Sequence, residues 1–88
     1  MNTQFKESFL KDLRAIKDRD LLALVNEIIQ AVENAQTPQE IPTFKKLRGE
    51  RNYFRIRIGD YRLGLKIEGQ LVTLVRILNR KEIYRYFP

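Results

Sequence analysis

The chain has 88 residues, of which 43% are apolar and 32% are charged, the size and balance of one small globular domain. It contains neither cysteine nor histidine, so disulfides, thiolate metal sites and histidine-dependent catalytic triads are excluded. No apolar run is long enough to cross a membrane, and the N-terminus lacks a signal-peptide core. We therefore expect a single cytoplasmic domain over residues 1–88, with no metal and no cofactor.

Positive charge is concentrated in the second half of the chain. Residues 1–44 carry five Lys or Arg and seven Asp or Glu, a net charge of −2, whereas residues 45–88 carry twelve and four, a net charge of +8. Eight of the ten arginines lie in the second half, and the guanidinium group is well shaped to bind phosphate. A solvated basic surface would produce the same asymmetry, so the positions of these charges decide whether an anionic partner is indicated.

The first half of the chain predicts two helices. Apolar residues recur at helical spacing from Ser8 to Ile16, and a wider apolar stripe follows from Leu21 to Val32. Asp18 or Asp20 can cap the second helix, and the prolines beyond it end the pattern. The short connection predicts an antiparallel helical hairpin that covers one face of a sheet and carries no chemistry of its own.

The second half predicts a three-stranded antiparallel meander. Residues 53–58 alternate between apolar and polar, Gly59-Asp60 forms a two-residue turn, and residues 61–67 alternate again. Glu68-Gly69 supplies a second turn, and residues 70–78 form the third strand.

The register of the first hairpin brings cations together on the face opposite the apolar one. The expected pairs on this face are Arg57 with Arg62, Arg55 with Gly64, and Tyr53 with Lys66. Like charges opposite one another destabilise a sheet, so this arrangement favours an anionic ligand over a merely solvated face. Gly64 lacks a side chain at a point where a ligand's backbone could approach closely.

An apolar strip lies beside this patch in the prediction. It consists of Leu71, Thr73, Val75 and Ile77 of the third strand. A strip of this kind, left uncovered, indicates that a second protein or the chain's own tail lies across the sheet.

The C-terminal tail interleaves aromatic and cationic residues. Ile83 and Phe87 have the character of anchors, and between and around them lie Arg80, Tyr84, Arg85 and Tyr86. This combination suits base stacking and phosphate binding, although the tyrosines could instead complete the core with their hydroxyls at the surface.

Four segments together resemble one protein family. They are residues 53–62, the preceding 44–49 with its K-x-L-x-G pattern, the later 79–84, and the opening 5–13. Their order and spacing are similar to those of the RelE/ParE toxin superfamily of bacterial type II toxin–antitoxin systems, over nearly the whole chain. The resemblance implies an α+β, microbial RNase-like fold, with the N-terminal helical hairpin on one face of a small antiparallel β-sheet. It also implies a short first strand near residues 2–6.

The resemblance carries a function with it. RelE-type members are ribosome-dependent endoribonucleases that cut mRNA in the ribosomal A site, and a cognate antitoxin neutralises them. By position, Arg62, Arg80 and Tyr84 resemble catalytic residues, with Arg62 at the scissile phosphate. The basic residues expected to bind RNA are Arg55, Arg57, Lys66, Lys45, Lys46, Arg48 and Arg85. Many relatives have histidine where this chain has Asn79.

Without histidine, the chemistry falls to arginine, tyrosine and lysine. Arg62 and Arg57 can stabilise charge that develops on the phosphate, and Tyr84, with Lys66 as the second candidate, remains for proton transfer. So few groups would need the ribosome to orient the mRNA. Two alternatives stay open: a ParE-type inhibitor of DNA gyrase, and a non-catalytic RNA- or protein-binding module on the same fold. In each toxin reading we expect an antitoxin that is acidic near its contact segment, and no membrane association.

Overall fold

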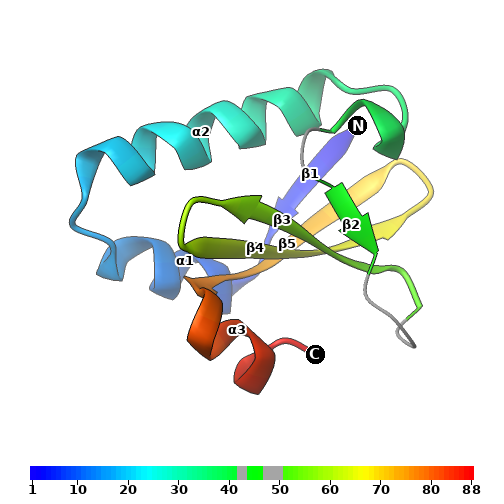
Figure 1. Cartoon of the computed structure of the whole chain (residues 1–88). Helices are drawn as coiled ribbons and strands as arrows, with labels where there is room; N and C mark the ends of the chain where they lie inside the picture. The colour runs from blue at the N-terminus through cyan, green and yellow to red at the C-terminus, as the bar shows by residue number, and fades with distance from the viewer. Residues whose placement is uncertain (42–43, 47–50) are drawn as a thin grey trace.

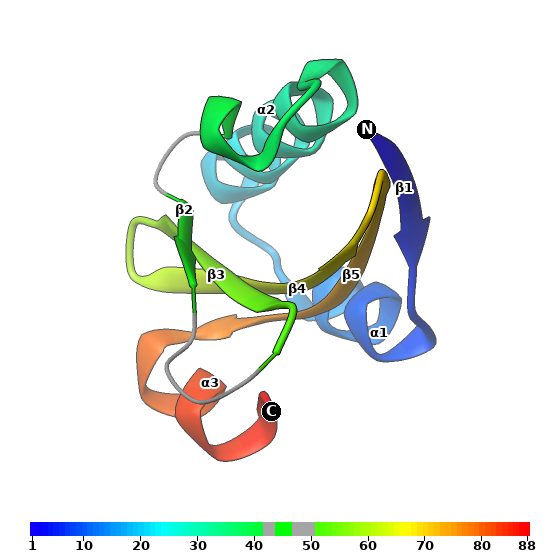
Figure 2. The same ribbon diagram turned by 90° about the vertical axis from the view of Figure 1, so that its right-hand side faces the viewer.

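The structure is a computed structural model that describes residues 1–41, 44–46 and 51–88. In chain order its elements are β1 (Asn2–Phe5), α1 (Glu7–Ala15), α2 (Arg19–Asn34), a 3-10 turn (Pro38–Glu40), β2 (Phe44–Lys46), β3 (Tyr53–Ile58), β4 (Tyr61–Glu68), β5 (Leu71–Asn79) and α3 (Arg80–Tyr86). The strands of the described residues form one five-stranded sheet in the order β1-β5-β4-β3-β2. Figures 1 and 2 show α2 on one side of this sheet and α3 on the other. None of the helices in these ranges has the length and apolar character that crossing a bilayer requires.

The α+β class and the short first strand are confirmed, but the sheet is mixed rather than antiparallel, because β1 pairs parallel with β5. Because the two strands run in the same direction, the chain leaves β1 beside the middle of β5 and continues into α1 alongside the second half of β5. The Lys6 backbone N–H donates to the Leu74 carbonyl oxygen (3.0 Å), and the Ser8 hydroxyl donates to that of Val75 (2.6 Å). Helix α1 therefore takes over from β1 in satisfying the backbone of β5.

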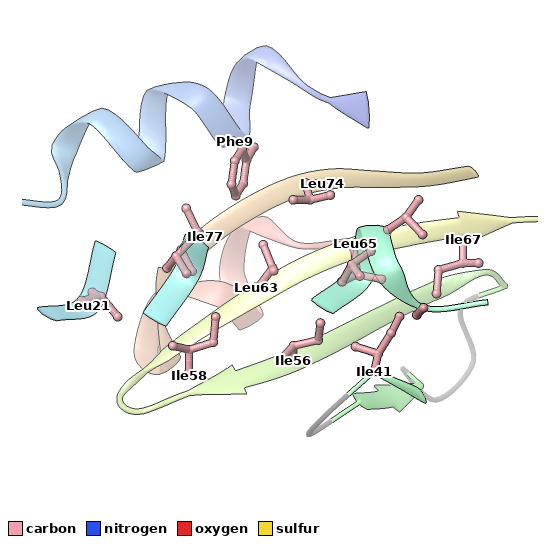
Figure 3. Close-up of a cluster of buried hydrophobic side chains, with 14 of the residues drawn as sticks. Phe9, Leu21, Ile41, Ile56, Ile58, Leu63, Leu65, Ile67, Leu74 and Ile77 are labelled. Atoms are coloured by element: carbon pink, nitrogen blue, oxygen red, sulfur yellow. The ribbon is translucent and has the colours of Figure 1, made fainter. Parts of the chain in front are cut away.

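Both N-terminal helices contribute buried apolar residues to one core, among them Phe9, Leu21 and Val25. Asp18, not Asp20, caps α2, because its carboxylate accepts hydrogen bonds from the backbone N–H groups of Asp20 (2.9 Å) and Leu21 (3.2 Å). The helical hairpin is an open one: α2 crosses the face of the sheet, whereas α1 lies beside β5 (Figure 2). Figure 3 shows Phe9 of α1 above Leu74 and Ile77 of β5, in the same cluster as Ile56, Leu63 and Leu65.

Both hairpin turns place glycine in the left-handed region. Gly59 (φ 57°) and Gly69 (φ 60°) allow the tight turns that connect β3 to β4 and β4 to β5. The first turn is the predicted one, with Ile58 opposite Tyr61. The second lies one residue later than predicted, because Glu68 pairs with Leu71. Along the first half of β5, each residue of β4 therefore pairs with a β5 residue two positions later than predicted; Ile67, for example, pairs with Val72. Because side chains alternate with a period of two, the residues in the first half of β5 still lie on the predicted faces of the sheet.

A β-bulge reverses the faces in the second half of β5. Leu74 pairs with Leu65 and Arg76 pairs with Gly64, so Val75 is an extra residue. Beyond the bulge Ile77 points into the core, where it is 1% exposed, and Arg76 lies on the opposite face. The prediction that Ile77 belongs to the strip beside the cationic patch is therefore wrong, since strict alternation has no place for an inserted residue.

Asp12 of α1 holds the bulge. Its carboxylate accepts hydrogen bonds from Nε (2.7 Å) and Nη2 (2.9 Å) of Arg76, and also from the Ile77 backbone N–H (3.1 Å). The two-pronged pairing raises the pKa of Arg76 above its usual value. One side chain thus satisfies both the arginine and the backbone exposed by the bulge.

Replacing Asp12 with alanine should lower the free energy of unfolding by about 2–4 kcal/mol, because it leaves a partly buried guanidinium and a backbone donor without their acceptor. Asp12→Asn keeps an acceptor and should lose about half as much. Urea unfolding monitored by circular dichroism measures both. Glu7→Ala, which removes an ion pair between exposed side chains, is the control and should change stability hardly at all. Equal losses for Asp12→Ala and Glu7→Ala would contradict this role.

Candidate functional site

Three residues form a row across the middle of the sheet. Gly64 of β4 pairs with Arg55 of β3 on one side and with Arg76 of β5 on the other. Directly opposed residues share a face of a sheet, and this row lies on the face away from α2. Helix α3 covers the same face (Figure 2). The sequence predicts the Arg55–Gly64 pair, whereas Arg76 joins the row only through the bulge.

The Phe87 ring packs directly on Gly64, which we call the seat of Phe87. A Cβ atom at Gly64 would lie 2.7–2.8 Å from three ring atoms of Phe87, closer than carbon atoms approach one another. The Phe87 ring is buried and packs edge-on against Tyr53, with ring centroids 5.6 Å apart. The space at Gly64 therefore serves the chain's own tail, and the prediction that it admits a ligand's backbone is wrong.

Both arginines of the row stack against tyrosines of α3. The guanidinium carbon of Arg55 lies 4.5 Å from the ring centroid of Tyr84, and that of Arg76 lies 5.5 Å from the ring centroid of Tyr86. Tyr84 is 67% exposed and Tyr86 is 52% exposed, so neither completes the core. The sequence predicts that either a second protein or the chain's own tail lies across this face. In the structure the tail lies there.

Sequence patterning does not predict α3 as a helix, although its signals are present. Asn79 caps the helix by accepting a hydrogen bond from the Lys81 backbone N–H (3.0 Å). Ile83, which is 0% exposed, and Phe87 lie four residues apart and anchor it to the sheet. A helix of seven residues holds too little of the apolar pattern to be recognised without the sheet beneath it.

The predicted catalytic arginines gather at the end of the sheet next to the β3–β4 turn. Arg57 lies directly opposite Arg62, as predicted, and Arg57 is exposed. The Arg80 backbone N–H donates to the Asp60 carbonyl oxygen (2.8 Å), which holds the start of α3 against that turn. Tyr84 follows one helical turn after Arg80 and so lies on the same side of α3.

Arg62 is tethered to the turn. Its Nη1 donates to the carbonyl oxygens of Gly59 (2.9 Å) and Tyr61 (2.8 Å). These bonds engage one nitrogen of a group that has five N–H donors, so the guanidinium can still bind an anion. The tether holds the guanidinium at the turn, and Arg57 occupies the directly opposite position on β3.

The other residues predicted to bind RNA lie outside the group formed by Arg57, Arg62 and Arg80. Lys66 is half-buried, pairs with Glu68 (3.6 Å) and lies 5.6 Å from the ring centroid of Tyr53, while Arg85 is exposed on α3. In the backbone register of β2 and β3, Lys45 lies opposite Arg55, and Lys46 lies opposite Phe54. Arg48 lies outside the described residues.

The arrangement supplies cations and the exposed phenol of Tyr84. Over residues 1–41, 44–46 and 51–88, no group of three or more carboxylates is placed to hold a metal ion. The chemistry these side chains can carry is charge stabilisation by Arg57, Arg62 and Arg80, with stacking or proton transfer by Tyr84.

Comparison with known proteins gives consistent matches along the chain. The family model described as the ParE toxin of type II toxin–antitoxin system, parDE, matches residues 3–84. Toxin RelE3 of Methanocaldococcus jannaschii is 35% identical over 89 aligned residues, which cover the whole of both chains.

Solved structures agree with these sequence matches. The RelB-RelE antitoxin–toxin complex from Methanococcus jannaschii matches with a TM-score of 0.80 and 33% identity, over 97% of this chain and 99% of that one. The toxin–antitoxin complex RelBE2 from Mycobacterium tuberculosis matches with a TM-score of 0.70 and 27% identity, over 90% of each chain. A YoeB dimer from Staphylococcus aureus, with a TM-score of 0.74 and 17% identity over 91% of this chain and 97% of that one, shares the fold.

Gly64→Ala should dislodge Phe87 and loosen α3, lowering the free energy of unfolding by about 1–3 kcal/mol, because the added methyl overlaps the ring. Hydrogen exchange of the α3 amides should become faster, while that of α2 should not change. Phe87→Leu is the matched background, since the smaller side chain leaves room for the methyl, and there Gly64→Ala should cost less. An equal cost in both backgrounds would show that Gly64 does not seat Phe87.

Proposed function

The chain belongs to the ParE toxin family and is a toxin of a type II toxin–antitoxin system, and from this premise we propose that it is a ribosome-dependent endoribonuclease that cuts mRNA and so inhibits translation. Its full-length similarity to Toxin RelE3 favours the RelE-like branch of the superfamily. The observation that carries the proposal is that Arg57 and Arg62 lie directly opposite each other next to the β3–β4 turn, that α3 begins at Arg80 against the same turn, and that Tyr84 follows one helical turn later.

Cleavage of RNA by its own 2′-hydroxyl makes three demands. The hydroxyl must lose a proton, the phosphate must be stabilised as negative charge builds up, and the 5′-oxygen must gain a proton as it leaves. Arg62 and Arg57 meet the second demand, because their always charged guanidinium groups come from directly opposed positions of the sheet. Arg80 adds a third cation from α3.

Tyr84 is the side chain best placed for the other demands. It projects from α3 above the basic face, and its exposed ring can stack on a base while its hydroxyl handles a proton. Lys66 is less suitable for proton transfer, because it lies beside Tyr53 and pairs with Glu68. With so few groups, a ribosome that holds the mRNA in the attack geometry would supply much of the rate.

A gyrase inhibitor is the second candidate, and the match to the ParE model favours it. Such a toxin would use the same fold for binding alone and would not need Arg62, Arg80 and Tyr84 together. A DNA supercoiling assay with purified gyrase separates the two functions. Inhibition of supercoiling, with mRNA left intact on translating ribosomes, would establish the gyrase inhibitor and overturn the endoribonuclease.

A cognate antitoxin is the expected protein partner, since the matched structures include RelB-RelE antitoxin–toxin complexes. We propose that its contact segment is acidic and lies against the basic face or the N-terminal helices. The second half of this toxin has a net charge of +8, which would attract such a segment.

Arg62→Ala should reduce mRNA cleavage on translating ribosomes by about 10²-fold or more, because it removes a preorganised charge from the phosphate site. Primer extension measures the cleavage, and growth after induction measures toxicity. Arg14→Ala on α1, which removes one exposed arginine that pairs with Glu7 and is not among the predicted site residues, is the control and should cleave normally. An Arg62→Ala variant that folds and cuts mRNA at the wild-type rate would remove Arg62 from the site.

Affinity for the antitoxin should fall as salt is added, but less steeply than affinity for RNA, because apolar burial carries part of the protein contact. Calorimetry at two or more salt concentrations measures the difference. Hydrogen exchange on the complex should show protection on β3 and β4 or on the N-terminal helices. Protection confined to other surfaces would contradict the proposed contact.

A further inference from the structure

We propose that Arg55 is a positioning residue that holds the ring of Tyr84 over the sheet, and that it does not bind the RNA phosphates itself. This inference deepens the proposed function and rests on it, because the consequence of positioning Tyr84 is read in cleavage. The charge pattern of the sequence places Arg55 with Arg57 among the RNA contacts, but their surroundings in the structure differ.

The stack between Arg55 and Tyr84 is set by the same cross-strand pair that seats α3. Arg55 lies directly opposite Gly64, which receives Phe87, and its guanidinium carbon is 4.5 Å from the centroid of the Tyr84 ring. Tyr84 and Phe87 are three residues apart, the spacing of neighbours on one side of a helix. Seating Phe87 on Gly64 therefore brings the Tyr84 ring onto Arg55.

The two arginines of the row are held differently. Arg76 is fixed by the carboxylate of Asp12, and Tyr86 stacks on an arginine that is already immobile. Within the described residues Arg55 has neither an ion pair nor a side-chain hydrogen bond, and its interaction is the stack with Tyr84. Arg55 is half-buried, whereas Tyr84 is 67% exposed and has no anchor of its own in the core. Tyr84 thus depends on Arg55 for its position.

Positioning and phosphate binding make different demands on residue 55. A phosphate ligand needs a positive charge, which lysine also provides. Stacking on an aromatic ring uses the flat guanidinium group, which covers the ring more fully than the compact ammonium of lysine can. Arg55→Lys therefore distinguishes the two roles better than Arg55→Ala does.

The first test is single-turnover cleavage of mRNA on translating ribosomes. Arg55→Ala should slow cleavage by about three- to tenfold, the range that corresponds to a cation–π contact, and Arg55→Lys, which keeps a weaker contact, should slow it by less. Neither should slow it further in the Tyr84→Ala background, whereas both should still do so in Tyr84→Phe, which keeps the ring. Lys66→Ala is the matched control: it removes a cation beside Tyr53 instead, so its effect should be the same in the wild-type and Tyr84→Ala backgrounds.

The second test does not depend on activity. The ring resonances of Tyr84 in an NMR spectrum, assigned by their loss in Tyr84→Phe, should move toward those of a solvated tyrosine in Arg55→Lys and stay in place in Lys66→Ala. Unmoved resonances in Arg55→Lys would overturn the proposal, as would wild-type cleavage by Arg55→Lys together with additive losses in the Tyr84→Ala background. If the wild-type toxin cleaves no mRNA, the proposed function fails, and the resonances alone still decide whether Arg55 positions Tyr84.

Discussion

The contact between the row Arg55–Gly64–Arg76 and the three aromatic side chains of the C-terminal segment organises this face of the molecule. Phe87 fills the space above Gly64, and a tyrosine stacks on the arginine at each side. Because glycine is flanked by two long side chains, the row forms a seat that a short helix can occupy in one position. A helix of seven residues has little stability of its own, so this seat holds α3 in place.

The position of Arg76 in this row in turn depends on the β5 bulge and on helix α1 beside it. Arg76 reaches the row because a bulge at Val75 reverses the faces of β5, and Asp12 of α1 stabilises that bulge through three hydrogen bonds. An ion pair of this kind contributes more because the Asp12 carboxylate also accepts a hydrogen bond from the Ile77 backbone N–H. Asp12 of α1 and Tyr86 of α3 therefore contact the same arginine, which links the two helices through β5.

This organisation divides the basic face into two regions. Near the middle of the sheet the face is covered by α3, and the cations there stack against aromatic rings. Near the β3–β4 turn Arg57, Arg62 and Arg80 gather where α3 begins. Helix α3 thus both covers the sheet and contributes Arg80 and Tyr84 to the candidate site, which makes its position important for any reaction there.

Local patterns in the sequence were sufficient for the parts of the fold that depend on neighbouring residues. Helical periodicity predicted α1 and α2, and alternation with a glycine turn predicted the β3–β4 hairpin and its register, including the pairs Arg57–Arg62 and Arg55–Gly64. These features follow from residues a few positions apart, so the sequence carries their signals directly. The tertiary structure decided the rest: the parallel pairing of β1 with β5, the bulge that moves Ile77 into the core and Arg76 onto the basic face, and the seating of Phe87 on Gly64. The strand pairing and the seating of Phe87 each join residues that are far apart in the chain. The bulge depends on a distant partner as well, because Arg76 is held by Asp12. Periodicity along the chain cannot contain such contacts, because their energy arises only when distant segments pack together.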